Sequence, residues 1–249
     1  MKNKIEFDYL KDREKTIASF DHDYNEKIDD IIANLNTIIL NFTYFFFKAP
    51  NQVFSDKKDS TFLLFRSIDY LFSAINLMRQ RACFETLTIL RLVIETSSTA
   101  FHISKDKEKL KEFKAGKYKS PKSIKFSKKY IPRLGEIWGA LSQSAVHINP
   151  RHGIYYTYIK DEYLVEGGSI CIGEKEKNEK QDYMLIILTK LSYNIIYRFF
   201  ELIFYQDAKY KGVDIKYNKE SGLVKIAKKT EEIIDELLAE LKKTANNTV

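Results

Sequence analysis

The amino-acid sequence predicts a mainly α protein, a helical bundle with a small inserted β-hairpin. Three observations support this prediction. All nine glycines lie at position 116 or later, and the first 115 residues contain a single proline, Pro50. Several long segments carry apolar residues at spacings of three and four, which is the period of an amphipathic helix. Residues 153–173 instead combine glycines with β-branched and aromatic residues, as short strands and turns do.

The chain of 249 residues is long enough to bury a sizeable core, and we expect a single helical domain over 1–249. Its hydrophobic content of 44% and aromatic content of 14% are typical of a globular protein rather than a disordered one. The domain divides into N-terminal helices (1–103), a lysine-rich connector (104–130), a helix with the β-hairpin (131–173) and C-terminal helices (174–249).

The N-terminal part is expected to form three helices before the central one. Residues 5–20 predict a short amphipathic helix. Asp21 or Asp23 then provides the N-cap of a second helix, which ends before Pro50 because proline disfavours helical geometry in the residue that precedes it. A third helix is expected over about 60–79, where apolar residues again repeat at helical spacing.

Residues 81–103 form the stretch around which the chain is organised. They contain neither glycine nor proline, and most of them are apolar. Read as a helix, the stretch has one narrow polar stripe on an otherwise apolar surface, which predicts a largely buried helix. Arg91, Glu95 and His102 lie within about 40° of one another on this stripe, and Arg81 lies about 40° to its other side.

Three interpretations of the polar stripe follow from its spacing. Arg81 with Glu85 and Arg91 with Glu95 can form surface ion pairs, worth a few tenths of a kcal/mol each. The same groups can form a structural ion pair inside the bundle, which sets the register of the helices. The third interpretation is a functional pocket, in which Arg91 binds an anion and Glu95 or His102 transfers a proton.

The positive charge of the protein is concentrated in residues 104–130. This segment holds eleven lysines and three acidic residues, a local charge of +8, while the net charge of the whole chain is +7. A run of like charges is typical of a solvated loop or mobile connector. It can also contact a phosphate-rich partner, either nucleic acid or anionic lipid. Because all eleven residues are lysine, a nucleic-acid contact through Lys105–Lys129 is expected to be non-specific.

A further helix is expected from about 133 to 148, ended by the Asn-Pro pair that follows it. Ser144 and His147 stand near its end, and Arg151 and His152 follow directly. Functional side chains are often presented at such a position. A histidine there also commonly caps the C-terminus of the helix, so both interpretations stay open.

The remaining elements follow in order. Segments 154–158 and 169–172 are rich in strand-forming residues and flank a tight Glu-Gly-Gly turn at 166–168, so they predict the inserted hairpin. A long helix is expected over 181–205, and a polar helix over about 224–243 closes the chain.

Several protein classes are excluded by missing signals. The N-terminus lacks the apolar segment of a secretory signal. Segments 38–47 and 184–205 are too short or too charged to span a bilayer, so we expect a soluble cytoplasmic protein without a membrane span. The two cysteines are too few for a disulfide framework and have no zinc-site spacing. Because no phosphate-binding glycine loop, nucleophile elbow or zinc-protease helix is present, no cofactor and no metal are expected.

The spacing of a few polar residues resembles that of known helical proteins. An Arg91-x-x-x-Glu95 helix, preceded by a long apolar helix and followed about fifty residues later by a Ser144-x-x-His147 helix end, resembles a family of helical bacterial proteins of unknown function. Some members of that family occur beside phage-defence genes. The all-helical layout is also similar to HEPN domains, many of which are RNases. Their signature, an arginine and a histidine separated by four to six residues, does not occur in this chain.

Two functional hypotheses follow. The first is a helical binding or interaction module, which the resemblance suggests is an accessory or sensor protein of a prokaryotic defence system. A homo-oligomer, most simply a dimer, or a protein partner is expected, because residues 44–47 are aromatic on all sides of a helix. The second is a HEPN-like metal-independent RNase, in which Arg91 holds a phosphate, His147 is the general acid or base and Glu95 orients one of them. The further candidate binding residues are Arg81, His102, Ser144, Arg151 and His152.

Overall fold

The computed structural model describes residues 9–48, 57–131, 133–145 and 179–205, and nearly all of these residues are helical. The mainly α class is therefore confirmed for the described part of the chain. The helices are α1 (Tyr9–Lys48), α3 (Lys58–Arg79), α4 (Cys83–Lys105), α5 (Lys107–Lys114), α6 (Pro121–Ser127), α7 (Leu134–Ala145) and α9 (Glu179–Phe200), which continues as the π-helical segment η2 (Glu201–Tyr205). The predicted hairpin and the predicted helix at 224–243 lie outside the described residues and stay predictions.

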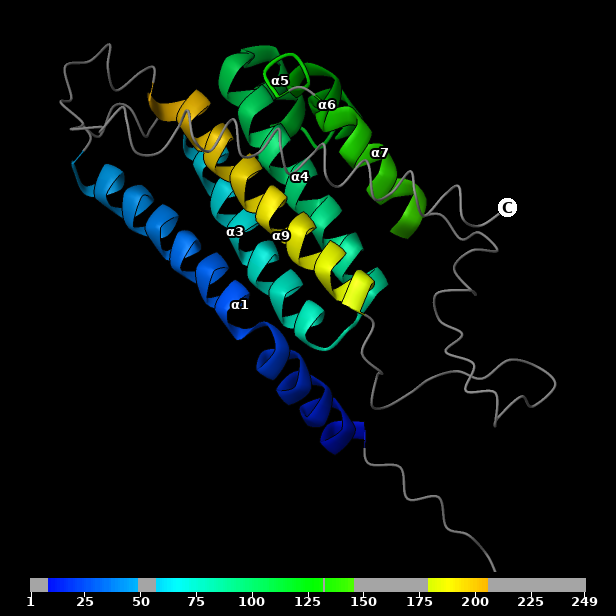
Figure 1. Ribbon diagram of the computed structural model, residues 1–249. Coiled ribbons are helices and arrows are strands. Elements are labelled where there is room, and N and C mark those ends of the chain that lie inside the picture. The colour runs from blue at the N-terminus through cyan, green and yellow to red at the C-terminus, as the bar shows by residue number, and fades with distance from the viewer. Residues whose placement is uncertain (1–8, 49–56, 132, 146–178, 206–249) are drawn as a thin grey trace, which may run out of the picture.

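Helix α4 is the centre of the bundle. It contacts α3, α9, α7, α6 and α5, and Figure 1 shows it between α3, α9 and the green helices α5, α6 and α7. Its apolar side chains, among them Leu90, Val93, Ile94 and Phe101, are fully buried, which confirms the prediction of a largely buried helix. Burial of this apolar surface from several sides is the main source of stability for the assembly.

Helix α1 is continuous where the sequence suggested two helices. It runs from Tyr9 to Lys48 without the break that was expected near Asp21 and Asp23. The two aspartates do not serve as N-caps. Their carboxylates form ion pairs instead, Asp21 with Arg79 at the end of α3 and Asp23 with Arg81 in the turn between α3 and α4. No glycine or proline interrupts this span, and Phe20 is fully buried, so the core holds the helix across the expected break.

Arg79, the last residue of α3, and Arg81, in the turn that follows, link α1 and α9 to the centre of the bundle. Arg79 binds the Asp21 carboxylate of α1 through two nitrogens, with its Nε 2.7 Å from Oδ1. The Arg81 guanidinium is buried, lies 3.1 Å from the Asp182 carboxylate of α9 and donates to Ser19 of α1. The prediction that Arg81 lies on the central helix was wrong. Arg81 lies in the turn before α4, with a left-handed φ of 51°.

The lysine-rich segment forms ordered structure, so the expectation of a solvated loop or mobile connector was wrong. It folds into α5 and α6, which pack on the C-terminal half of α4. Asp106 caps α5 by accepting the backbone N–H groups of Glu108 and Lys109, at 2.9 and 3.1 Å, and Pro121 occupies the first turn of α6. Ile124 is buried and anchors α6 to the core. Apolar residues placed among the lysines therefore decide the fold of the segment.

The Arg81–Asp182 pair generates a stability prediction. Both side chains are almost completely buried, at 5% and 2% exposure. Asp182→Asn leaves a buried guanidinium with one charge partner fewer, and we expect it to lower the free energy of unfolding by about 3–5 kcal/mol in urea denaturation. Lys190→Met is the matched control, because it breaks an exposed pair between α9 and Asp30 of α1, and it should cost less than about 1 kcal/mol. Equal losses in the two variants would contradict this account.

Candidate functional site

The first cluster on the polar stripe of α4 joins Arg91 and Glu95 to α7. Arg91 Nη2 lies 2.8 Å from Glu95 Oε1, so the predicted i,i+4 pair is present. Trp138 of α7 donates its indole N–H to the same carboxylate oxygen at 2.8 Å. The guanidinium carbon of Arg91 lies 5.3 Å from the Trp138 ring centroid, in range for a cation–π contact. Each of the three side chains therefore contacts both of the others.

In this arrangement Arg91 and Glu95 help to hold α7 against α4. Both are largely covered, with 21% and 13% of their side chains exposed, and the stripe does face a neighbouring helix. Arg91 Nε is buried without a hydrogen-bond partner among the described residues. A phosphate that approached Arg91 would compete with Glu95 and Trp138 for the guanidinium. The geometry matches the buried structural pair, the second of the three interpretations drawn from the sequence.

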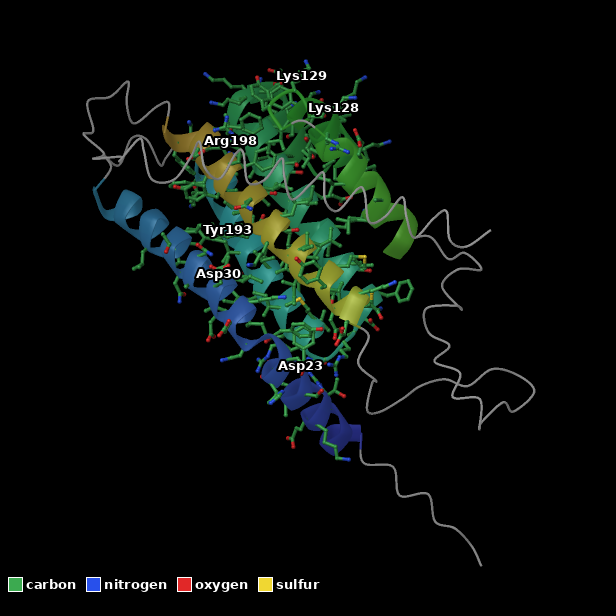
Figure 2. The ribbon with its side chains drawn as sticks, in the orientation of Figure 1. Asp23, Asp30, Lys128, Lys129, Tyr193 and Arg198 are labelled. Carbon is green, nitrogen blue, oxygen red and sulfur yellow. The ribbon has the colours of Figure 1, made fainter. Side chains whose placement is uncertain are left out.

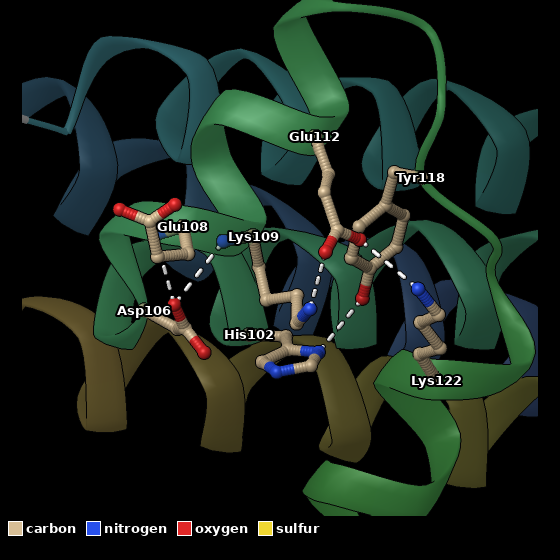
Figure 3. A network of polar contacts seen from close by, with 7 residues as sticks. All are labelled: His102, Asp106, Glu108, Lys109, Glu112, Tyr118 and Lys122. Atoms are coloured by element: carbon tan, nitrogen blue, oxygen red, sulfur yellow. Dashed lines mark hydrogen bonds and ion pairs between the residues drawn. The ribbon is translucent and has the colours of Figure 1, made fainter.

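The second cluster surrounds His102, which is buried near the C-terminus of α4. Its ring stacks on Phe126 of α6, with centroids 4.2 Å apart and planes 8° from parallel. Its Nδ1 lies 2.8 Å from the hydroxyl of Tyr118, in the segment between α5 and α6. Figure 3 shows this hydrogen bond beneath the charged residues of α5 and α6. His102 therefore connects α4 to α6 and to the segment between α5 and α6.

Charged side chains close the site above His102. Glu112 binds Lys109 of its own helix and accepts from Lys122 of α6 at 3.0 Å, so it bridges α5 and α6 (Figure 3). Burial lowers the pKa of His102 from its ordinary value, and the nearby charges of both signs oppose one another around it. Burial also raises the pKa of Tyr118 to about 12. Both groups are therefore neutral near pH 7.

The two clusters are separate sites. Glu95 and His102 are seven residues apart, about 10 Å along a helix, and they are covered by different elements. Thr99 lies between them in the sequence and donates a hydrogen bond to Ser123 of α6 at 3.3 Å. Helix α6 therefore packs against α4 between the two clusters. In the described part of the chain, Arg91 and Glu95 therefore share one cluster and His102 belongs to another, rather than all three lining one pocket.

The RNase hypothesis depends on His147, which lies outside the described residues. His147, Arg151 and His152 lie outside the described residues, and so does the side chain of Ser144. Arg91 and Glu95 lie together, as that hypothesis requires, and the position of the imidazole of His147 stays a prediction. The side chains of 44–47, on which the dimer was predicted, are likewise outside the description.

Sequence reasoning missed the partners that complete both clusters. No role was predicted for Trp138 in its helix, or for Tyr118 and Phe126 within the run of lysines. One signal could have identified Trp138: an indole N–H that enters a core needs an acceptor, and Glu95 was the polar residue available on the most buried helix. For Tyr118 and Phe126 no comparable signal exists before the segment is known to fold back on α4.

The lysine cap, residues 105–130, is a strongly charged part of the surface among the described residues. Its three acidic residues are engaged, because Asp106 caps α5, Glu108 pairs with Lys111, and Glu112 pairs with Lys109 and Lys122. The exposed lysines whose side chains have no partner among the described residues are Lys107, Lys117, Lys119, Lys125, Lys128 and Lys129. Figure 2 shows Lys128 and Lys129 at the end of the bundle opposite Asp23.

Comparisons with known proteins add no relative. No family model matches the chain, and no similar curated protein or solved structure was found. Within the described ranges, no helix has the length and apolar character needed to cross a bilayer. The described residues also contain no group of histidine, cysteine, aspartate or glutamate side chains that could hold a metal ion.

The Glu95 cluster can be tested with the only tryptophan in the chain as its probe. Glu95→Ala leaves the Arg91 guanidinium and the Trp138 N–H without their shared acceptor. We expect it to cost about 1.5–3 kcal/mol of unfolding free energy, measured in urea by Trp138 emission. Glu85→Ala, on the exposed side of the same helix, should cost less than about 1 kcal/mol. A wild-type-like midpoint for Glu95→Ala would contradict the structural role of the cluster.

The His102 cluster predicts a pH dependence of stability. Because the pKa of His102 is lowered on folding, the unfolded chain binds the proton more readily than the folded one. The contribution of neutral His102 is complete above about pH 6.5 and is lost as the pH falls from there through the lowered pKa. The free energy of unfolding should therefore drop between pH 7.5 and 5.5 more steeply in wild type than in His102→Gln. His22→Gln, which changes an exposed side chain, should follow wild type, and parallel curves for wild type and His102→Gln would refute the coupling.

Proposed function

We propose that the protein is a helical binding module whose lysine cap attaches it non-specifically to nucleic acid. The observation that carries the proposal is the set of exposed cap lysines that have no partner among the described residues, which lie on α5 and α6, between these helices and in the turn after α6. The cap carries a charge of +8. Because the net charge of the whole chain is +7, the remaining residues sum to −1. A surface with this polarity attracts phosphate chains and orients the protein toward them.

The order of the cap supports this role. A disordered lysine segment loses conformational entropy when it binds, whereas these lysines project from a backbone that is already fixed. The backbone is held by the Asp106 N-cap, by burial of Ile124 and by the hydrogen bond between His102 and Tyr118. Binding then orders only the lysine side chains, whose flexible stems adapt to phosphates at many positions.

The cap suits nucleic acid better than a membrane surface. A helix that lies in the lipid interface needs an exposed apolar face beside its basic one. The apolar residue Ile124 of α6 is buried against the bundle, and the small residues Ser123 and Ser127 beside it are buried too. The exposed side of α6 thus offers charge without an apolar face to insert.

The proposal places the module in the setting that the family resemblance implies, an accessory or sensor protein in prokaryotic defence. Contact with phosphates through lysine suits such a role, because it requires no particular sequence in the nucleic acid. The Arg91–Glu95–Trp138 cluster then serves to hold α7 against the bundle rather than to bind substrate.

The salt dependence of binding tests the proposal. Lys125→Gln/Lys128→Gln/Lys129→Gln removes three charges from the exposed end of α6. Fluorescence anisotropy with a labelled oligonucleotide should show affinity reduced about tenfold or more at low salt, and a slope of log K against log salt smaller by about 2 for a single strand. Lys15→Gln/Lys27→Gln/Lys180→Gln removes the same charge from α1 and the start of α9, and it should bind like wild type.

Three results would overturn the proposal. One is binding that does not weaken as salt rises, and another is equal weakening by the two triple variants. The third is binding to anionic vesicles but not to oligonucleotides. Cleavage of RNA during the same incubation, abolished by His147→Ala, would favour the RNase hypothesis instead.

A further inference from the structure

We propose that Tyr130 is a stacking platform for an unpaired base, so that the preferred ligand of the lysine cap is single-stranded nucleic acid. This inference rests on the proposed function and adds a ligand class to it. The contact would place a base on the phenol ring while the neighbouring lysines hold phosphates on either side. Basic surfaces with aromatic rings are the common design for binding single strands without sequence preference.

The Tyr130 ring is both exposed and fixed. It keeps 44% exposure, yet it packs edge-on against the fully buried Phe101, with ring centroids 4.9 Å apart and planes 84° apart. Phe126 contacts it from α6 at 5.5 Å. The turn below the ring is closed by hydrogen bonds from the backbone N–H groups of Tyr130 and Ile131 to the carbonyl of Ser127, at 2.9 and 3.0 Å. A ring held in this way loses little freedom when a base stacks on it.

The surroundings of Tyr130 are those of a phosphate-binding surface. Lys128 and Lys129 lie in the same turn, and Lys125 lies one helical turn before Lys129. All three are exposed, and their side chains have no partner among the described residues. Tyr118, the other tyrosine of the cap apart from Tyr130, is hydrogen-bonded to His102 and half-buried, so it is already engaged.

Tyr183 is a second exposed tyrosine, and its surroundings differ from those of Tyr130. It is as exposed as Tyr130, at 48%, but Lys27 lies over its ring at 4.7 Å from the centroid. Tyr183 lies at the start of α9, outside the lysine cap. The exposed large apolar side chains in the described part of the chain are Leu40, Phe62, Tyr130 and Tyr183. Of the aromatic residues in this group, Tyr130 is the one that lies in the lysine cap.

Stacking selects for single strands because the bases of a duplex are already stacked on one another. A ring on a protein surface reaches a base in a duplex only if that base leaves the helix, which costs unstacking and unpairing. The phosphate contacts have no such requirement and are available in both forms. The lysines therefore set the general affinity, and Tyr130 sets the preference between single and double strands.

The test separates the base from the phosphate. Anisotropy at one low salt concentration compares a 15-nucleotide thymidine strand, its uridine counterpart, a strand of equal length that is largely abasic, and a duplex of equal length. Wild type should bind the first two more tightly than the other two. Tyr130→Leu keeps the apolar packing on Phe101 but removes stacking, so it should lose about 5- to 100-fold in affinity for the thymidine and uridine strands alone. Tyr130→Phe and Tyr183→Leu should bind like wild type.

The outcomes distinguish this inference from the proposed function. If Tyr130→Leu binds every probe like wild type, or loses affinity equally for all four, Tyr130 is not a stacking platform, although the lysine cap still binds phosphates. If wild type binds none of the probes, both the inference and the proposed function fail. Thermal unfolding of Tyr130→Leu checks that a loss of binding does not reflect a loss of fold. If the leucine variant unfolds, the wild-type comparison still decides, because equal affinity for the thymidine strand and the largely abasic strand would overturn the inference.

Discussion

Burial of α4 on several sides is the constraint on which the rest of the structure depends. A polar group inside a bundle is stabilised by a partner, because a buried donor or acceptor that is left unsatisfied costs about 1–3 kcal/mol. The narrow stripe of α4 meets this requirement with partners from outside the helix. Glu95 accepts a hydrogen bond from the indole N–H of Trp138, and His102 is hydrogen-bonded to the hydroxyl of Tyr118. These two hydrogen bonds help to position the elements that supply the partners, which are α7 and the lysine cap.

The same constraint explains how a segment of charge +8 can fold. Repulsion among lysines favours an extended chain, and only interactions with the core can oppose it. Ile124 and Phe126 provide apolar contacts, His102 provides a polar one, and Glu112 neutralises the lysines nearest the core from both α5 and α6. Glu112 is the less exposed of the two paired glutamates of the cap, at 31% against 73% for Glu108, and the six lysines without a partner among the described residues are all exposed.

The elements that could be predicted from the sequence are those with a long apolar period. Helices α3, α4 and α9 were predicted within a few residues of their observed bounds, since their own side chains specify both the period and the buried face. The break expected in α1 did not occur, because Asp21 and Asp23 bind arginines distant in the sequence. Helices α5 and α6 were missed for a related reason: their order depends on contacts with α4, which local sequence does not show. In the candidate site, the Arg91–Glu95 pair could be predicted from i,i+4 spacing, whereas Trp138 and Tyr118 are tertiary partners and could not.

The position of the cap relative to the two clusters determines which kind of function the fold can support. A catalytic site needs groups that change partner during a reaction, and the charged groups on the stripe of α4 are held by neighbours that also hold the bundle together. Releasing Glu95 from Arg91 and Trp138 would loosen α7, and protonating His102 would weaken the contact that holds the cap. The outer lysines carry no such structural load, so they can exchange solvent for phosphate without cost to the fold. The division between an inner surface committed to packing and an outer surface available for contact is what favours a binding module over an enzyme for this part of the chain.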